Sequence, residues 1–494
     1  MQRKRKPTRK TRFAAAARTA PLSSWTSLTR SARIAVLPIV AAVASAQPSM
    51  AAGSKQVVYQ TEDGHVHELS KTTDGSWQHA DLTQLTGAPP TGIKSWGAYD
   101  ASPVGYGWDA GASKQVVYWG NDAHVHELYF IRGGQWKHAD LTQRSRAPVP
   151  VDSEGNPLPW GPLSAYAWEA GKSKQVVYLT ENGHINELCI SLDGGGCPHY
   201  LGPFVSTEWQ HLDLTNWTLA PEAEIFLPGG PSPCALSGYA WEKGRSKQVA
   251  YITSDGHIRE VYFELGGVPT KRWVRADLTA RIKPSYCSGT QAPKCDGPTI
   301  DSHRVENNAC RFQGYGWNRW KQVAYQANDD IKFDAHIIGE IYAGPADWSY
   351  GNLSFAAGLD LDPCIFSTAY AWEAGGSKQV VCKDRRDSHI FELYTWGGTW
   401  RSVDLTELTG APTPISSQVL GYSWEAGKSK QVVYTTRDGH IQELSVGLDG
   451  GWQHKDLMTE VTGEVPPAPA DGSLLSAFGW NLPDPPRRSP VPVN

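Results

Sequence analysis

Several features that mark common classes of protein are missing from this 494-residue chain. No segment has the 3.6-residue apolar spacing of an amphipathic helix, so we do not expect helices to build the core. No Gly-x-Ser-x-Gly turn, phosphate-binding loop or dinucleotide fingerprint occurs, and the Asp-Gly-His turns lack the alternating oxygen ligands of a calcium loop. We therefore predict that the protein is not an enzyme, has no catalytic residues and needs no cofactor.

Runs of basic residues are absent after the first 33 positions. Ten Lys and Arg residues lie between Arg3 and Arg33, where no Asp or Glu occurs, and without these ten the formal net charge changes from −4 to −14. An acidic chain without a basic patch does not attract phosphate backbones or anionic lipids. We therefore predict neither a nucleic-acid partner nor insertion into a membrane.

The first fifty residues differ from the rest of the chain. The basic segment is followed by an apolar run over residues 34–46, which is too short to span a bilayer and ends in the small residues Ala44, Ser45 and Ala46. This pattern predicts a secretion signal over residues 1–46 with cleavage near Ala46, a linker over 47–52 and an extracellular protein. At the other end, the Pro-rich residues 483–494 are predicted to be a disordered tail.

Cysteine is scarce, with eight residues and no Cys-x-x-Cys pair, which argues against a zinc site built on cysteine. The cysteines fit an oxidising compartment. The sequence does not fix how they pair, but Cys189 with Cys197 and Cys287 with Cys295 are the closest pairs along the chain. Cys382 stands where the other repeats described below have Tyr.

A repeated phrase is the dominant feature that is present. A Lys-Gln pair opens a β-branched run, a turn follows, and then comes a His-x-x-Glu segment, at intervals of 52 to 74 residues. The seven copies begin at Lys55, Lys114, Lys174, Lys247, Lys321, Lys378 and Lys430.

Each copy contains four segments with strand-like composition. In the second copy these are residues 105–108, the Lys-Gln-Val-Val-Tyr run, the His-Val-His-Glu-Leu run, and residues 136–142. Turn pairs such as Asp63-Gly64 separate the second and third segments and permit the positive φ angles of a tight hairpin. Every copy therefore predicts a small sheet of four antiparallel strands.

Seven such sheets predict an all-β fold, a seven-bladed β-propeller over residues 53–482. The first copy begins at its second strand, and an extra first strand, residues 477–480, follows the last copy. We expect this C-terminal strand to pair into the first blade and close the ring.

Polar and aromatic residues recur inside the predicted blades. The third strand always carries Glu, and in five copies a Gln of the second strand precedes it by twelve residues, so the two lie on neighbouring strands. The Trp of each first strand completes the set. We predict that these residues bind carbohydrate: Gln56, Glu68, Gln115, Glu127, Gln175, Glu187, Gln248, Glu260, Gln379, Glu392, Gln431, Glu443, Trp108, Trp168, Trp241, Trp372, Trp424 and Trp480.

The chemistry behind this prediction is hydrogen bonding plus an aromatic plate. A carboxylate and an amide can bond sugar hydroxyls, and an indole can cover the apolar C–H face. Two alternatives stay open: the Glu could pair with a Lys of the adjacent strand, and Tyr106 with Trp108 could pack blade on blade.

Recurrent His and Asp residues are interpreted as structural. A His-x-His pair occurs only at His65 with His67 and at His124 with His126, and the second His is replaced in the other copies, so we predict no metal site. The Asp of the fourth strand is replaced once by Asn352, which favours a hydrogen-bonding role over an ionised one.

The phrase over residues 421–444 resembles the repeats of propeller lectins, both the fungal fucose-specific lectins with six blades and the bacterial Photorhabdus-type lectins with seven. The likeness covers about residues 53–480. It implies multivalent binding of fucose-like or O-methylated sugars in shallow pockets between blades, glycoconjugates as partners, and assembly into a homo-oligomer. In the fungal pattern an Arg stands where this chain has Gln56 and its equivalents, so the charged donor fork is missing.

Two other functions remain open at this point. The insertions that carry cysteine, around residues 189–209 and 287–310, could make the protein an interaction scaffold. A glycoside hydrolase would require one unique pair of carboxylates, whereas those of this chain recur in most copies. The fifth copy departs most from the pattern, with eighteen residues between Gln322 and Glu340, and we predict no working site there.

Overall fold

The computed structural model describes the ranges 53–92, 102–151, 161–193, 196–197, 208–223, 236–265, 273–281, 312–328, 336–343, 348–359, 364–416 and 418–481. The predicted signal (1–46), linker (47–52) and tail (483–494) lie outside them, as do Cys287 and Cys295. No helix in these ranges is long and apolar enough to cross a membrane.

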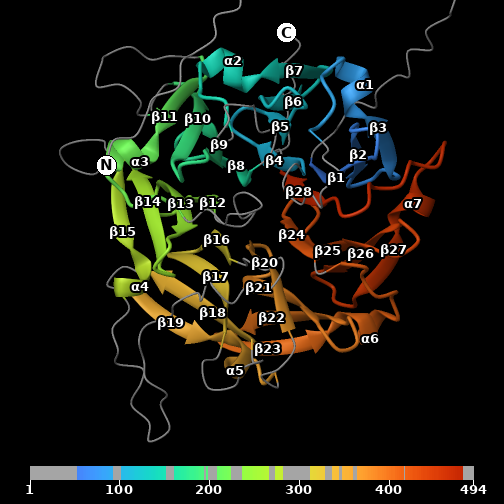
Figure 1. The fold of residues 1–494 in the computed structure, drawn as a ribbon. Helices are drawn as coiled ribbons and strands as arrows, with labels where there is room; N and C mark the ends of the chain where they lie inside the picture. The colour runs from blue at the N-terminus through green and yellow to red at the C-terminus, as the bar shows by residue number, and fades with distance from the viewer. Residues whose placement is uncertain are drawn as a thin grey trace, which may run out of the picture. The chain divides into compact units, whose positions relative to one another are not determined.

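The described chain forms seven four-stranded antiparallel sheets, which confirms the predicted fold class (Figure 1). Blade 1 consists of β28 (Ser476–Trp480), β1 (Ser54–Gln60), β2 (Val66–Thr72) and β3 (Gln78–Asp81). Blade 2 consists of β4 (Val104–Trp108), β5 (Ser113–Trp119), β6 (Val125–Ile131) and β7 (Trp136–Asp140). Blade 3 consists of β8 (Leu163–Trp168), β9 (Ser173–Leu179), β10 (Ile185–Ser191) and β11 (Gln210–Asp213).

The remaining four blades follow the same order. Blade 4 consists of β12 (Leu236–Trp241), β13 (Ser246–Ile252), β14 (Ile258–Glu264) and β15 (Val274–Asp277). Blade 5 consists of β16 (Phe312–Trp317), β17 (Trp320–Asn328), β18 (His336–Ala343) and β19 (Trp348–Asn352). Blade 6 consists of β20 (Cys364–Trp372), β21 (Ser377–Asp384), β22 (Ile390–Trp396) and β23 (Thr399–Asp404). Blade 7 consists of β24 (Leu420–Trp424), β25 (Ser429–Thr435), β26 (Ile441–Gly447) and β27 (Gln453–Asp456).

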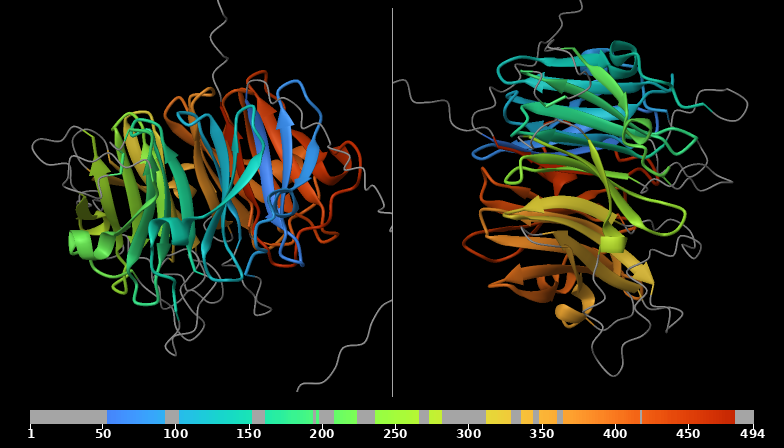
Figure 2. Two further views of the ribbon diagram at one scale, coloured as in Figure 1. Left: turned by 90° about the horizontal axis from the view of Figure 1, so that it is seen from above. Right: turned by 90° about the vertical axis from the view of Figure 1, so that its left-hand side faces the viewer.

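The ring closes as the permuted ends of the repeat predicted. The C-terminal strand β28 pairs antiparallel with β1, with Phe478 opposite Gln56. The first strand of each blade contacts the first strand of the next, and β24 contacts β28. Figure 1 places these seven strands around the centre of the propeller, and Figure 2 shows the strands of the blades standing upright side by side.

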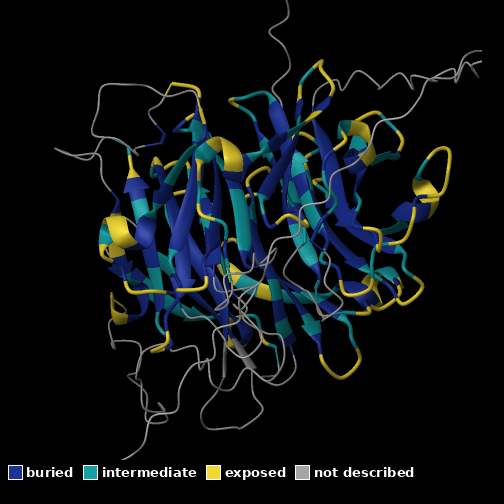
Figure 3. Ribbon diagram, turned by 45° about the horizontal axis from the view of Figure 1, so that its top comes forward, coloured by how far each residue is buried: buried dark blue, intermediate teal, exposed yellow. Residues whose placement is uncertain are grey.

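The core lies between the blades rather than inside any one of them. Seven clusters of buried apolar side chains occur in the described residues, and each joins two consecutive blades. A single four-stranded sheet cannot cover its own faces, so each blade buries them against its neighbours. The inner strands are mostly buried and the fourth strands only partly, while exposed residues gather in the short helices and hairpin turns (Figure 3).

One expectation about secondary structure was wrong. The segment predicted as a fourth strand over residues 136–142 ends as a strand at Asp140, and its Leu-Thr pair begins a helix of one turn. The same change occurs in every blade, giving α1 (Leu82–Thr86), α2 (Leu141–Ser145), α3 (Leu214–Thr218), α4 (Leu278–Arg281), α5 (Leu353–Ala356), α6 (Leu405–Thr409) and α7 (Leu457–Glu460). Helices of four or five residues are too short to show a 3.6-residue period in the sequence.

The Asp of the fourth strand explains why these helices begin there. Asp81 Oδ1 accepts the backbone N–H of Gln84, and Asn352 does the same for Phe355 in blade 5. The other oxygen of Asp81 bonds Nδ1 of His65 at 2.7 Å. The hydrogen bonds predicted for the recurrent Asp and His are thus present.

Two disulfides occur in the described residues. Cys189 pairs with Cys197, as proximity suggested, and Cys364 pairs with Cys382 across β20 and β21. The second bond was not predicted, because its partners are 18 residues apart and only the strand pairing brings their Cα atoms to 5.5 Å. Disulfides of this kind fit an oxidising compartment.

Candidate functional site

The predicted Gln and Glu residues share one face of each blade, which looks toward the next blade. In blade 2, Glu127 stands opposite Val117 and Gln115 lies two residues before it, so the two side chains point the same way. All seven recurrent Glu side chains and all seven Gln side chains are at most 2% exposed. The structure thus brings the Gln and Glu of each blade together, but inside the contact between blades.

Every recurrent Glu forms an ion pair with the Lys of the next blade. In six of the pairs the Nζ and carboxylate oxygens are 2.6–2.8 Å apart, and Lys378 with Glu340 forms the seventh pair. The other pairs are Lys114 with Glu68, Lys174 with Glu127, Lys247 with Glu187, Lys321 with Glu260, Lys430 with Glu392 and Lys55 with Glu443. The alternative that Glu pairs with a Lys is confirmed. The expected position of that Lys was wrong, because it comes from the next blade and not from the adjacent strand.

These ion pairs are enclosed by aromatic rings. Lys174 Nζ lies 5.5 Å from the ring centroids of Trp108 and Tyr129 and 5.2 Å from that of Trp209. Burial lowers the pKa of Lys174 below its usual value, while the attraction of Glu127 opposes that shift. The charges of Glu and Lys therefore neutralise each other within the contact between the two blades.

The rings around the ion pair of Lys174 come from both blades. Trp108 belongs to the same blade as Glu127, whereas Trp209 precedes the fourth strand of the blade that supplies Lys174. The aromatic ring from the neighbouring blade is thus that of the Trp before its fourth strand. The predicted first-strand Trp residues are also buried, from 0% exposed at Trp168 to 7% at Trp372, apart from the half-buried Trp241.

Two sets of residues at these contacts between blades were not among the predicted site residues. The Lys precedes Gln in every copy, and a Trp lies four residues before each fourth-strand Asp or Asn, so both sets were visible as repeats. Their partners lie 38 to 388 residues away along the chain, and no local pattern indicates which blades they join. The fourth-strand set is Trp77, Trp136, Trp209, Trp273, Trp348, Trp400 and Trp452.

Polar atoms without partners lie beside these ion pairs. Each Gln donates from Nε2 to the Ser two residues earlier wherever that Ser is present, as Gln175 does to Ser173 at 2.6 Å. The Oε1 atom of all seven Gln residues is buried and accepts no hydrogen bond from any described residue. The indole Nε1 atoms of Trp108, Trp168, Trp372, Trp424 and Trp480 are likewise buried with no described partner.

A second candidate position is the mouth of the central channel. A cavity of about 420 Å³ is lined there by the beginnings of the innermost strands, with hydroxyl groups from Ser164, Ser237 and Ser476. Ser237 Oγ and Ser476 Oγ accept backbone N–H groups of the next blade, those of Gly314 and Gly105. No Asp, Glu, Lys, Arg, His or Cys is among the described residues that line it, so these residues supply no acid or base.

Comparison with known proteins gives similarity at the level of structure only. No protein-family model matches the chain, and no curated protein sequence does. A lectin from Burkholderia pseudomallei is 13% identical over 82% of this chain and 94% of its own, with a TM-score of 0.49. The lectin of the fungus Aleuria aurantia, described as a six-bladed β-propeller that recognises fucose, is 15% identical over 77% of this chain and 99% of its own, with a TM-score of 0.44.

A third solved structure is that of the SapL1 lectin in complex with alpha methyl fucoside. It is 15% identical over 75% of this chain and 98% of its own, with a TM-score of 0.39. Lectin propellers are thus among the structures that this chain resembles, as the repeated phrase suggested. The fold itself follows from the strand pairing described above.

Proposed function

We propose that this protein is a secreted, multivalent carbohydrate-binding protein that takes fucose-like or O-methylated sugars between its blades, without catalysis. One observation carries the proposal. At five contacts between blades, the predicted Gln and Trp of one blade present a buried acceptor and a buried donor that no described residue satisfies.

A sugar hydroxyl suits both of these atoms. A buried polar atom without a hydrogen bond costs about 1–3 kcal/mol, so Gln115 Oε1 and Trp108 Nε1 favour any guest that bonds them. A hydroxyl both donates and accepts, and a ring C–H face packs on an indole. Tyr129, which stands opposite Gln115 in the strand register, is half-buried.

In this proposal the paired carboxylates do not contact the sugar themselves. Glu127 holds Lys174, and Lys174 in turn lies among Trp108, Tyr129 and Trp209. The ion pair positions the aromatic walls and leaves the amide and indole as the groups that contact sugar. The pocket is then neutral, which fits an uncharged sugar better than an acidic one.

Repetition around the ring favours binding over catalysis. Single sugar sites bind weakly, but several sites on one rigid ring gain avidity on a surface that displays many copies of a sugar. The blades with both unsatisfied atoms are 1, 2, 3, 6 and 7. Blade 4 differs because Trp241 Nε1 donates to the carbonyl oxygen of Asn318.

The first experiment is a glycan array with the purified extracellular chain, including fucosylated and O-methylated sugars, with and without calcium. We expect binding to a subset of neutral sugars that does not depend on calcium. A folded sample that binds nothing on the array would overturn the proposal.

The second experiment removes one acceptor at a time. Gln115→Met replaces the amide with an apolar side chain of similar size, and we expect the number of bound sugars per chain in calorimetry to fall by one. Gln322→Met is the matched control, because blade 5 is predicted to have no working site. If internal water is the only guest of these atoms, both variants will keep the full stoichiometry.

A further inference from the structure

The outer hairpins of blades 1 and 2 gather more imidazoles than those of the other described blades. Six blades tie a hairpin His to the Asp that caps the following helix, with Nδ1 and Oδ2 2.6–2.9 Å apart. In blade 1, His67 and His79 lie beside this pair, with His67 Nδ1 2.9 Å from His79 Nε2. In blade 2, His126 and His138 make the same contact at 2.9 Å.

Two other blades show which hydrogen bond the fold requires at the position of His67. Blade 3 has Asn186 in place of His67, and its Oδ1 accepts from His211 Nε2 at 2.8 Å. Blade 7 has Gln442 there, and its Oε1 accepts from His454 Nε2 at 2.8 Å. An amide therefore completes the hydrogen bond, and a second imidazole is not needed for folding.

Blade 4 shows that the position of His67 can hold a cation between two carboxylates. Arg259 stands at the position of His67, and its guanidinium lies 2.6 Å from Asp255 Oδ2 and 3.1 Å from Asp277 Oδ2. These two Asp residues correspond to Asp63 and Asp81 of blade 1. The chain thus places its own cation between the two carboxylates in blade 4, while blades 1 and 2 place only imidazoles there.

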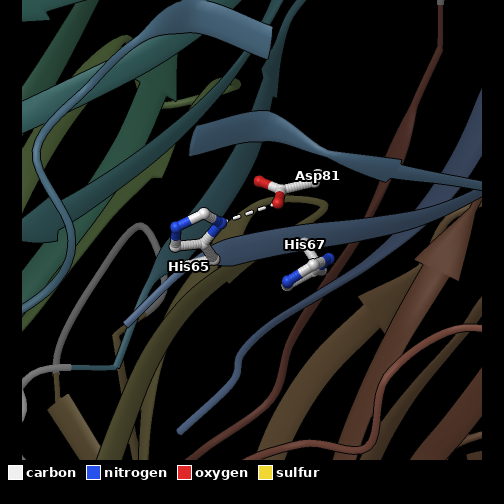
Figure 4. A group of neighbouring side chains, drawn as sticks. All are labelled: His65, His67 and Asp81. Carbon is white, nitrogen blue, oxygen red and sulfur yellow. Dashed lines mark hydrogen bonds and ion pairs between the residues drawn. The ribbon is translucent and has the colours of Figure 1, made fainter. Parts of the chain in front are cut away.

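The donor atoms of blade 1 are close enough to share an ion. One ligand atom each from His65, His67 and Asp81 lies within 4.8 Å of the others, and Figure 4 shows His65 and Asp81 joined with His67 beside them. Asp81 is opposite His67 in the β2–β3 register, so both belong to one face of the sheet. Tetrahedral zinc with bonds of 2.0–2.2 Å needs donors about 3.3 Å apart, so these side chains would rotate closer together to bind it.

Blade 2 offers a related set, in which the turn residue Asp122 takes part in place of the second His. Ligand atoms of Asp122, His124 and Asp140 also lie within 4.8 Å of one another. His126 Nε2 is 2.9 Å from Asp122 Oδ1 and holds that carboxylate toward the cluster. Zinc binds both imidazole nitrogen and carboxylate oxygen. In blade 1, the side chain of His65 is 35% exposed, which leaves an entry path for an ion from solvent.

We propose that blades 1 and 2 each bind one Zn²⁺ ion, at His65, His67 and Asp81 in the first and at Asp122, His124 and Asp140 in the second. The prediction of no metal rested on a ligand set that did not persist through all seven copies. His79 contacts His67 and His138 contacts His126, through a strand pairing that is not visible in the local motif.

The test is zinc titration of the untagged extracellular chain by isothermal calorimetry, after removal of metal by EDTA. We expect two ions per chain. His67→Gln copies blade 7 and should keep the hydrogen bond to His79 while removing one ion, with at least a 30-fold loss of affinity at that site. His126→Asn copies blade 3 and should weaken the second site by a similar factor, because it releases Asp122.

A gain-of-site variant and a control complete the design. Gln442→His in blade 7 gives that hairpin the ligand set of blade 1, and we expect a third ion. His389→Gln alters the hairpin of blade 6, which has Phe391 in place of the second His, and should leave the stoichiometry at two. No zinc uptake by a folded sample, or uptake that neither His67→Gln nor His126→Asn changes, would overturn the proposal.

Discussion

The Lys of each repeat is the residue that ties one blade to the next. Lys114 is fully buried, and its ammonium lies 2.6 Å from Glu68 and 5.0 Å from the centroid of Trp136. Burial lowers the pKa of Lys114, and the attraction of Glu68 opposes that shift. A buried ion pair adds little over apolar residues of the same size, but either ion alone is costly. The seven pairs therefore favour one blade arrangement over others.

A double-mutant cycle tests this role. Lys114→Met leaves the carboxylate of Glu68 buried without its cation, and we expect the free energy of unfolding in urea to fall by about 3–5 kcal/mol. Adding Glu68→Leu removes the unpaired charge and should restore stability to within about 1 kcal/mol of the natural chain. A loss below about 1 kcal/mol for Lys114→Met alone would contradict the proposed role of the Lys114–Glu68 pair in joining the two blades.

The turn after each innermost strand is an element that also joins neighbouring blades. The carboxylate of Glu169 accepts the backbone N–H groups of Asp109 and Ala110 at 2.8 and 2.6 Å, and Glu242 serves blade 3 in the same way. Blades 1 and 5 have Asn481 and Asn318 at the corresponding position. Burial, with the nearby Glu169 charge adding to it, raises the pKa of Asp109 to about 7.

This shift predicts a pH-dependent effect of Asp109→Asn. The pKa of Asp109 in the folded chain is above its unfolded value of about 3.9, so its contribution to stability falls as pH rises from about 4 to 7. The amide cannot ionise, and Asn481 shows that the turn accepts it. We expect the Tm of the variant to rise by about 3 °C at pH 8 and to change little at pH 4.5. Scanning calorimetry at both pH values checks this, and an equal shift at both would refute the assignment to ionisation.

At the scale of the whole molecule, closure of the ring depends on one short strand. β28 supplies the innermost strand of blade 1, and Trp480, 1% exposed, packs edge-on against Phe130 of blade 2. Without β28, one edge of β1 loses its partner and blades 7 and 2 lose a shared neighbour. An open ring would then expose apolar surface that the closed ring buries.

Truncation tests closure directly. A chain that ends at residue 474 lacks β28, and we expect its Tm to fall by about 10 °C or more, with loss of a single cooperative transition. A chain that ends at Asn481 keeps the strand and is the matched control. If the two chains unfold at the same temperature, closure by β28 is not what stabilises the ring.

The sequence by itself determined the number of blades, the strand order and the closing strand. Those features follow from patterns within a few residues, such as the Asp63-Gly64 turn and the alternation along the Lys-Gln-Val-Val-Tyr run. Only the tertiary structure decided the partners of the repeated side chains, because these partners lie on the next blade. Glu68 meets Lys114, Cys364 meets Cys382 and His67 meets His79 through strand pairing and packing that no local motif specifies. The recurrent Glu, read from the sequence as a sugar-binding group, lies in the structure within the ion pairs between blades, and the Gln and Trp beside it keep the atoms that still lack a partner.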